Sequence, residues 1–99
     1  MSKARKTLER VLRGDADANI KFRDLCSMLK SLDFQERVRG SHHIFTRDAI
    51  PEILNLQPKG KNAKPYQVKQ VRELILGYGL AEQGGEDDDK GGPKLEQQP

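Results

Sequence analysis

Both histidines of the chain stand together, in the stretch Arg39-Gly40-Ser41-His42-His43-Ile44-Phe45-Thr46. The unperturbed pKa of an imidazole lies near neutrality, so a histidine can both accept and donate a proton at physiological pH. Three arginines, Arg37, Arg39 and Arg47, lie close by in the sequence. A basic turn that carries histidine is what a metal-free RNA-cleaving site requires, although an ordinary hairpin can carry the same residues by chance.

RNA can be cut without a metal ion because its own 2′-hydroxyl can attack the neighbouring phosphorus. The protein must remove the hydroxyl proton, offer a proton to the leaving 5′-oxygen and stabilise the negative charge on the phosphate. The alternation after the turn places His42 on one face of a strand and His43, with Phe45, on the other. We therefore do not expect the two histidines to share a metal ion or to act as a pair.

Each of these residues also has a simpler interpretation. His42 could only cap the turn, and His43 could only pack beside Phe45. Ser41 is better explained as a turn residue than as a nucleophile, because no Ser-His-acid set is visible. The residues alone leave these alternatives open, and the rest of the chain must decide between them.

The composition restricts the possible sites. With 99 residues the chain predicts one small domain, and its hydrophobic content of 34% is low for a compact domain. The lone Cys26 excludes an internal disulfide and a cysteine-rich zinc site, and its apolar helical surroundings predict a buried structural thiol. We expect no metal site and no cofactor. The apolar runs are too short for a signal peptide or a membrane span, so we expect a cytoplasmic protein without a membrane partner.

The net charge of +3 is divided unevenly along the chain. Residues 82–99 hold six acidic residues and two lysines, so residues 1–81 carry a net charge of +7. A small basic domain favours an anionic partner, and nucleic acid is the first candidate. The alternatives are a solvated basic surface and a surface that binds an acidic protein.

Two helices are expected before the histidines. Residues 3–13 predict a short helix with a basic outer face, which Gly14 ends. Residues 21–32 predict a stronger helix, with Asn19 as its N-cap. Its apolar stripe comprises Phe22, Leu25, Cys26, Met28, Leu29 and Leu32.

Three strands and a last helix are expected to follow. The strands cover residues 34–38, 42–46 and 52–57, with a turn at Gly40-Ser41, a loop at 47–51 and an end at Pro58. A basic, glycine-containing loop at 59–64 then leads into a helix over 65–78, which Pro65 begins and Gly79 ends. The apolar stripe of this helix comprises Val68, Val71, Leu74, Ile75 and Tyr78.

Short connections between the strands predict an antiparallel sheet, with both long helices on one face. The fold class is therefore α+β, in the α-β-β-β-α order of double-stranded-RNA-binding domains, with an additional short N-terminal helix. We divide the chain into a basic helix and loop (1–18), the sheet-containing domain (19–81) and an acidic tail (82–99). The tail is expected to be disordered because it has almost nothing apolar to bury.

Three stretches carry a family resemblance: Leu29 to Phe34, Arg39 to Phe45, and Ile75-Leu76-Gly77-Tyr78-Gly79-Leu80. From about Asn19 to Leu80 the chain resembles the HicA family, the toxins of bacterial and archaeal HicAB toxin–antitoxin pairs. The resemblance implies an endoribonuclease (mRNA interferase) toxin of a type II system, with a double-stranded-RNA-binding-like fold. It also implies a catalytic histidine in the Gly-Ser-His turn, and a HicB antitoxin that covers the site.

The resemblance favours His42 as the catalytic acid or base, because His42 matches the family's position at the turn, with His43 as runner-up. RNA contacts are expected from Arg37, Arg39, Ser41, Lys59, Lys61 and Lys64. Where family members often have a histidine after the third strand, this chain has Gln57. The alternative functions are a non-catalytic RNA-binding module and a protein-interaction module with a basic surface.

Overall fold

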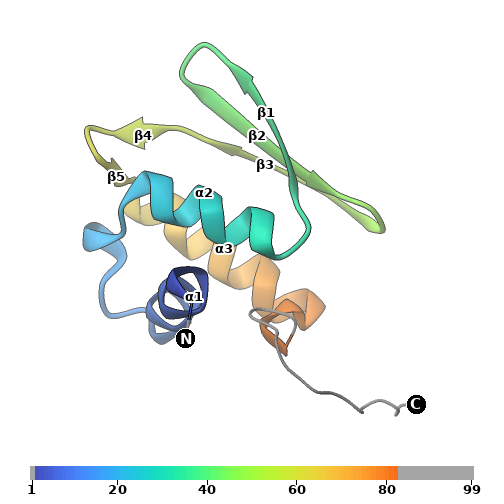
Figure 1. Cartoon of the computed structure of the whole chain (residues 1–99), viewed down its shortest axis with the longest axis horizontal. Coiled ribbons are helices and arrows are strands. Elements are labelled where there is room, and N and C mark those ends of the chain that lie inside the picture. Colours follow the sequence, from blue (N-terminus) through green and yellow to red (C-terminus); the bar gives the residue numbers. More distant parts are fainter. Residues whose placement is uncertain (1, 83–99) are drawn as a thin grey trace.

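In the computed structural model of the protein, residues 2–82 are described, so the predicted tail lies outside them apart from its first residue (Figure 1). The helices are α1 (Lys3–Arg13), α2 (Phe22–Ser31) and α3 (Pro65–Tyr78), with short 3₁₀ turns η1 (Asp17–Asn19) and η2 (Leu80–Glu82). The strands are β1 (Gln35–Arg39), β2 (His42–Arg47), β3 (Ile50–Leu56), β4 (Pro58–Lys59) and β5 (Asn62–Ala63). None of the described helices is long and apolar enough to span a membrane.

The predicted α+β fold is confirmed. Strands β1, β2 and β3 form an antiparallel sheet in that order, and α2 and α3 cover the same face of it (Figure 1). Helix α1 lies on the far side of α2 and α3 from the sheet (Figure 1). The predicted stripe of α2 is buried, including Cys26, and it packs with Val68, Val71 and Ile75 of α3 and with Phe45 of the sheet. The other face of the sheet is left uncovered by the described helices (Figure 1).

Helix α1 belongs to the same core. It begins at Ser2, whose side chain accepts a hydrogen bond from the amide of Arg5, and it ends at Gly14 with a φ of 75°. Leu8 and Val11 are fully buried against the other helices. The guanidinium of Arg72 on α3 donates to the carbonyl of Val11, and it also donates to the Asp17 carboxylate. Arg72 therefore fastens the N-terminal segment to the last helix.

Replacing Arg72 by alanine should lower the stability of the protein by about 2 kcal/mol, because hydrogen bonds to a charged group and a part-buried carbonyl are lost together. Thermal unfolding should show this as a decrease of several degrees in Tm. The matched control is Arg13→Ala, which removes an exposed ion pair with Asp15 and should change Tm little. Equal, small effects of both variants would contradict the fastening role of Arg72.

The prediction that Asn19 caps α2 is wrong. Asn19 lies in η1, and the N-cap position is Lys21, which makes no side-chain capping bond. The amide of Phe22 donates instead to the carbonyl of Lys61 at 3.0 Å. Ile20 is buried and its carbonyl accepts from the amide of Ala63, so the segment before α2 is held extended against β5. A backbone hydrogen bond thus satisfies an amide at the start of α2 that a capping side chain would otherwise satisfy.

The predicted basic loop at 59–64 is also wrong, because β4 and β5 form a second antiparallel hairpin. Pro58 pairs with Ala63 at its start, so the chain stays extended beyond the end of β3. The tip of this hairpin is Gly60, whose φ of 62° is easy for glycine. The second strand of the hairpin also pairs with the segment before α2, through a bridge between Lys21 and Asn62.

The predicted loop at 47–51 reduces to the two residues Asp48 and Ala49, and β3 begins at Ile50. Ile50 is buried, which favours an earlier start of the strand. Pro51 is tolerated because β3 is an edge strand.

Helix α3 begins at Pro65 and ends at Gly79, as predicted, but its last apolar position is not in the core. Tyr78 is 42% exposed, and its hydroxyl donates to the carboxylate of Glu52 on β3. This hydrogen bond raises the pKa of Tyr78. The tyrosine therefore joins the end of α3 to the sheet edge at the surface.

Candidate active site

His42 is the first residue of β2, directly after the turn Gly40-Ser41, and it is exposed. Its Nδ1 lies 2.9 Å from the side-chain oxygen of Asn55 on β3. An amide oxygen can only accept, so Nδ1 carries the proton of the neutral ring. Nε2 is then the nitrogen that can exchange a proton with a bound molecule.

The uncovered face of the sheet surrounds His42 with positive charge. Arg39 is the direct cross-strand partner of His42, and Arg37 is the partner of Ile44, which also pairs with Asn55. Paired residues of an antiparallel sheet point to the same face. Arg37, Arg39, His42 and Asn55 therefore share the face opposite the helices, where an anion can approach.

The hydroxyl of Ser41 belongs to a hydrogen-bond chain that crosses to α3. Ser41 Oγ accepts from the side-chain amide of Gln57 at 2.8 Å, and the amide oxygen of Gln57 accepts from Lys64 Nζ at 3.3 Å. The chain brings Lys64, predicted to contact RNA, to the same turn as Ser41. Ser41 makes no hydrogen bond with either histidine among the contacts of the described residues.

Gln67 on α3 binds the backbone of the strand segment that carries Asn55 and Gln57. Its side chain is buried, with 6% of the residue exposed. Its amide oxygen accepts from the backbone N–H of Gln57 at 3.0 Å, and its amide nitrogen donates to the carbonyl of Asn55 at 3.1 Å. The Gln67 side chain thus holds the backbone of both Asn55 and Gln57. Asn55 orients His42, and Gln57 binds Ser41.

Sequence reasoning missed Asn55, Gln57 and Gln67 as site residues. A signal for Gln67 was present, because it lies four and seven residues before Val71 and Leu74, on the buried stripe of α3. A polar residue on such a stripe needs hydrogen-bond partners inside the protein. The hydrogen bonds of Asn55 and Gln57 depend on strand register and had no sequence signal.

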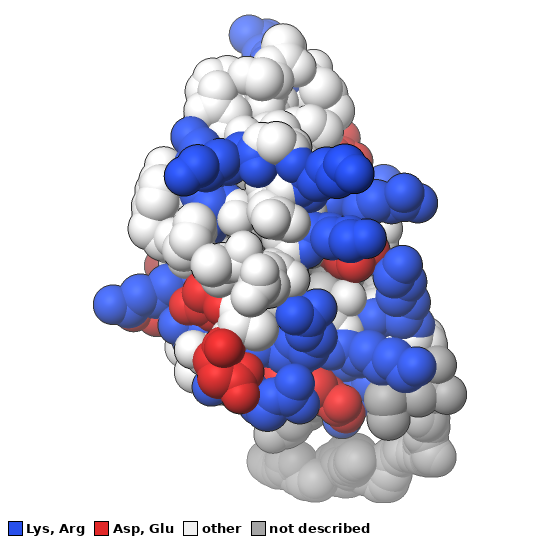
Figure 2. Space-filling model, turned by 90° about the vertical axis from the view of Figure 1, so that its left-hand side faces the viewer, with Lys and Arg blue, Asp and Glu red and all other residues white. Residues whose placement is uncertain are grey.

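Lys59 and Lys61 lie apart from the histidine turn, in the β4–β5 hairpin, and both are exposed. The hairpin and the β1–β2 turn are found toward the same end of the molecule (Figure 1). Lys and Arg atoms cover much of the surface seen from that end, with fewer acidic groups between them (Figure 2). Among the predicted RNA-contacting residues, Arg37 and Arg39 share the open sheet face with His42. Of the predicted lysines, only Lys64 is linked to the turn by hydrogen bonds.

His43 has a different environment, on the helix-facing side of the sheet. Its ring makes a T-shaped contact with Phe22 of α2, with the ring centroids 4.8 Å apart. Its Nδ1 lies 2.7 Å from a carboxylate oxygen of Glu36, and the other oxygen binds Lys30 at 3.3 Å. The hydrogen bond from His43 is the main reason that the pKa of Glu36 is lowered.

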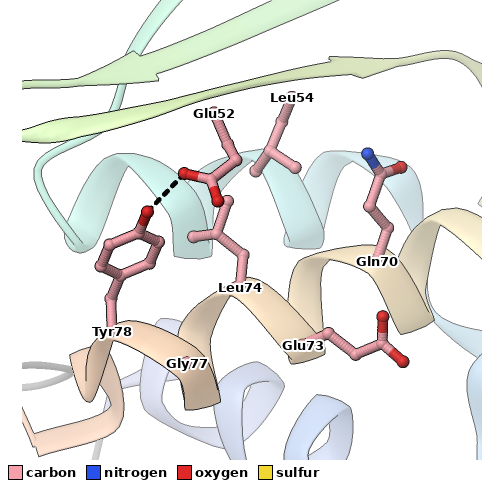
Figure 3. A pocket seen from close by; sticks show the side chains of 7 residues that line it. All are labelled: Glu52, Leu54, Gln70, Glu73, Leu74, Gly77 and Tyr78. Atoms are coloured by element: carbon pink, nitrogen blue, oxygen red, sulfur yellow. Dashed lines mark hydrogen bonds between the residues drawn. The ribbon is translucent and has the colours of Figure 1, made fainter.

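A separate hollow lies between β3 and α3 (Figure 3). It is lined by Glu52, Leu54, Gln70, Glu73, Leu74, Gly77 and Tyr78. Figure 3 shows the Glu52 carboxylate turned toward Tyr78, and Glu73 of α3 also lines the hollow. Two carboxylates disfavour a phosphate, so this hollow is not a candidate for RNA binding.

Comparison with known proteins identifies the family of the chain. A family model described as the HicA toxin of bacterial toxin-antitoxin matches residues 22–76. The match runs from the start of α2 into the last turns of α3 and includes both histidines, Asn55, Gln57 and Gln67. No curated protein and no solved structure matches the chain. Because the family model covers more than half of the 99 residues, the chain belongs to the HicA family of toxins of bacterial toxin–antitoxin systems.

Proposed function

We propose that this HicA-family toxin is an endoribonuclease that cuts mRNA without a metal ion, with His42 as its general acid or base. The observation that carries the proposal is the setting of His42. Its ring is exposed on the open face of the sheet, its Nδ1 is held by Asn55, and Arg39 stands directly opposite. A fixed ring with one free nitrogen beside a cation is suited to proton transfer at a phosphate.

In the proposed reaction the neutral His42 accepts the 2′-hydroxyl proton on Nε2. The 2′-oxygen attacks phosphorus, the bond to the 5′-oxygen breaks, and a 2′,3′-cyclic phosphate forms. The leaving 5′-oxygen takes a proton from solvent water, and His42 afterwards returns its proton to solvent. The cations of Arg39 and Lys64 stabilise the charge on the phosphorane. One proton transfer of this kind contributes about 10²–10⁴-fold to the rate.

His43 is the second choice for the same role. Its Nδ1 is bound to a carboxylate, and its ring packs against Phe22, with 25% of the side chain exposed. A carboxylate partner also occurs beside catalytic histidines, so the contact with Glu36 does not exclude His43. His42 is exposed on the uncovered sheet face, where a polymeric substrate can reach it, and this favours His42 over His43 as the catalytic residue.

The same surface serves the proposed partners. RNA lies along the basic surface and is recognised through its phosphates and its shape. A HicB-like antitoxin covers the open sheet face and so keeps the RNA away from His42. Acidic groups on the antitoxin would complement Arg37 and Arg39.

The test of this function uses the purified toxin, free of antitoxin, with RNA in the presence of EDTA. Cleavage should continue, and the 5′ fragments should end in a 2′,3′-cyclic phosphate, because the attacking group is the RNA's own hydroxyl. Products that end in a 3′-hydroxyl, or cleavage that stops in EDTA, would contradict the mechanism. Binding without cleavage would favour the non-catalytic RNA-binding module.

Replacing Lys59, Lys61 and Lys64 together by alanine should weaken binding to all RNA sequences alike, since these residues are proposed to contact phosphates. The plot of log affinity against log salt concentration should lose about 2 units of slope for single-stranded RNA. The control is Lys6→Ala on α1, which lies on the far side of the helices from the sheet. An unchanged slope in the triple variant would place the RNA on another surface.

A further inference from the structure

Three side chains that bind metals in other proteins meet on the helix-facing side of the sheet: Cys26 of α2, Glu36 of β1 and His43 of β2. Their donor atoms, one thiol sulfur, one carboxylate oxygen and one imidazole nitrogen, all lie within 4.8 Å of one another. Cys26 and Glu36 are 10 positions apart in the sequence and Glu36 and His43 are 7 apart, a spacing that matches no metal-binding motif. The fold alone brings them together.

The donor set is suited to Zn²⁺. Thiolate, imidazole and carboxylate are its usual ligands, at about 2.0–2.3 Å, and they select against Mg²⁺ and Ca²⁺. Donors around a tetrahedral zinc ion are roughly 3.3–3.8 Å apart by that geometry. Side-chain adjustments of about 1 Å therefore suffice to bring the three donors around one ion.

The surroundings leave one side of the cluster accessible. Cys26 is 7% exposed, whereas the side chains of Glu36 and His43 are 17% and 25% exposed. An ion can enter from the exposed side, and a water molecule can supply the fourth ligand there. Lys30, which binds the second oxygen of Glu36, has a half-exposed side chain and can stay on that oxygen or turn to solvent.

We propose that Cys26, Glu36 and His43 form a zinc site with three protein ligands and one open position. On binding, the proton of the Cys26 thiol leaves to solvent, and the ring proton of His43 moves from Nδ1 to Nε2, so that Nδ1 bonds the metal. Burial raises the pKa of the metal-free thiol to about 12, which makes it unreactive, whereas coordination deprotonates a thiol directly.

The site lies on the opposite face of the sheet from His42. Zinc there ties α2 to the β1–β2 hairpin and stabilises the fold without entering the cleavage step. A ligand that binds only the folded state raises Tm. Chelation should consequently lower the Tm of the zinc-loaded protein while cleavage continues at temperatures where the protein stays folded.

The test uses Co²⁺ as a spectroscopic probe of the full chain. Because Cys26 is the only cysteine, a thiolate-to-cobalt charge-transfer band in the near ultraviolet can come from no other residue. We expect this band, its loss on addition of Zn²⁺, and an increase in Tm on the order of 10 °C at zinc about a hundredfold above its Kd. Absence of the band in the wild type would overturn the proposal.

Variants separate this site from binding elsewhere. Cys26→Ala should abolish the band, and Glu36→Gln and His43→Gln should each weaken zinc binding at least about tenfold. His42→Ala, on the other face, should bind zinc as the wild type does. An unchanged zinc-induced shift in Tm in Cys26→Ala would also overturn the proposal, and if that variant fails to fold, an unchanged zinc affinity in Glu36→Gln would do so.

Discussion

Replacing His42 by alanine should abolish RNA cleavage and growth arrest while folding and RNA affinity stay nearly intact. A proton transfer acts in the transition state, whereas phosphate contacts act in the bound state as well. The rate constant for cleavage should therefore fall by about 10²–10⁴-fold with little change in Kd. Single-turnover cleavage and equilibrium binding measured on the same RNA separate the two quantities.

Two matched variants complete this experiment. Asn55→Ala removes the acceptor that holds Nδ1 of His42 and should reduce cleavage less than His42→Ala does. His43→Ala should instead lower stability, because it removes the contacts with Phe22 and Glu36. Cleavage that persists in His42→Ala but disappears in His43→Ala would reverse the assignment.

The second large effect is expected from Gln67. Gln67→Leu introduces an apolar side chain of similar size and leaves the carbonyl of Asn55 and the amide of Gln57 without their partners. Each of the two unsatisfied groups costs about 1–3 kcal/mol, so we expect the free energy of unfolding to fall by about 2–6 kcal/mol. This corresponds to a decrease in Tm of at least roughly 10 °C. Asn55 and Gln57 also position His42 and Ser41, so the rate of cleavage at low temperature should fall at least about tenfold.

Gln70→Leu is the control for this variant, because Gln70 is exposed on the same helix. It should change stability by no more than about 0.5 kcal/mol and leave cleavage unaltered. Equal stabilities of the Gln67 and Gln70 variants would show that the two backbone bonds are dispensable. A Gln67 variant that is destabilised yet fully active would show that Gln67 stabilises the fold but does not position the site.

Local patterns in the sequence predicted the main elements of the fold, because those elements are determined by neighbouring residues. The apolar stripe of α2, Pro65 at the start of α3 and the left-handed Gly79 at its end are examples. The β4–β5 hairpin and the uncapped start of α2 were not predicted. Both depend on the pairing of Lys21 with Asn62, which are far apart in the sequence. Pairings of this kind have no local signal.

The site divides in the same way. Alternation along β2 predicted that His42 and His43 point to opposite faces, and the structure has them so. The partners that orient them, Asn55 and Glu36, come from other strands and are identified only by register. The ring contact between His43 and Phe22 likewise had no local signal, because Phe22 belongs to α2.

The fastening of the N-terminal segment by Arg72 has a consequence for synthesis on the ribosome. Arg72 and Val11 are 61 residues apart, and Gln67, which supports the site, lies on the same late helix. Non-local contacts form late, because the chain between them must first be ordered. A nascent chain that has not yet released α3 has an incomplete core and no support beneath Asn55. The proposed cleavage site should therefore become active only once α3 has left the ribosome and packed against the sheet and α1.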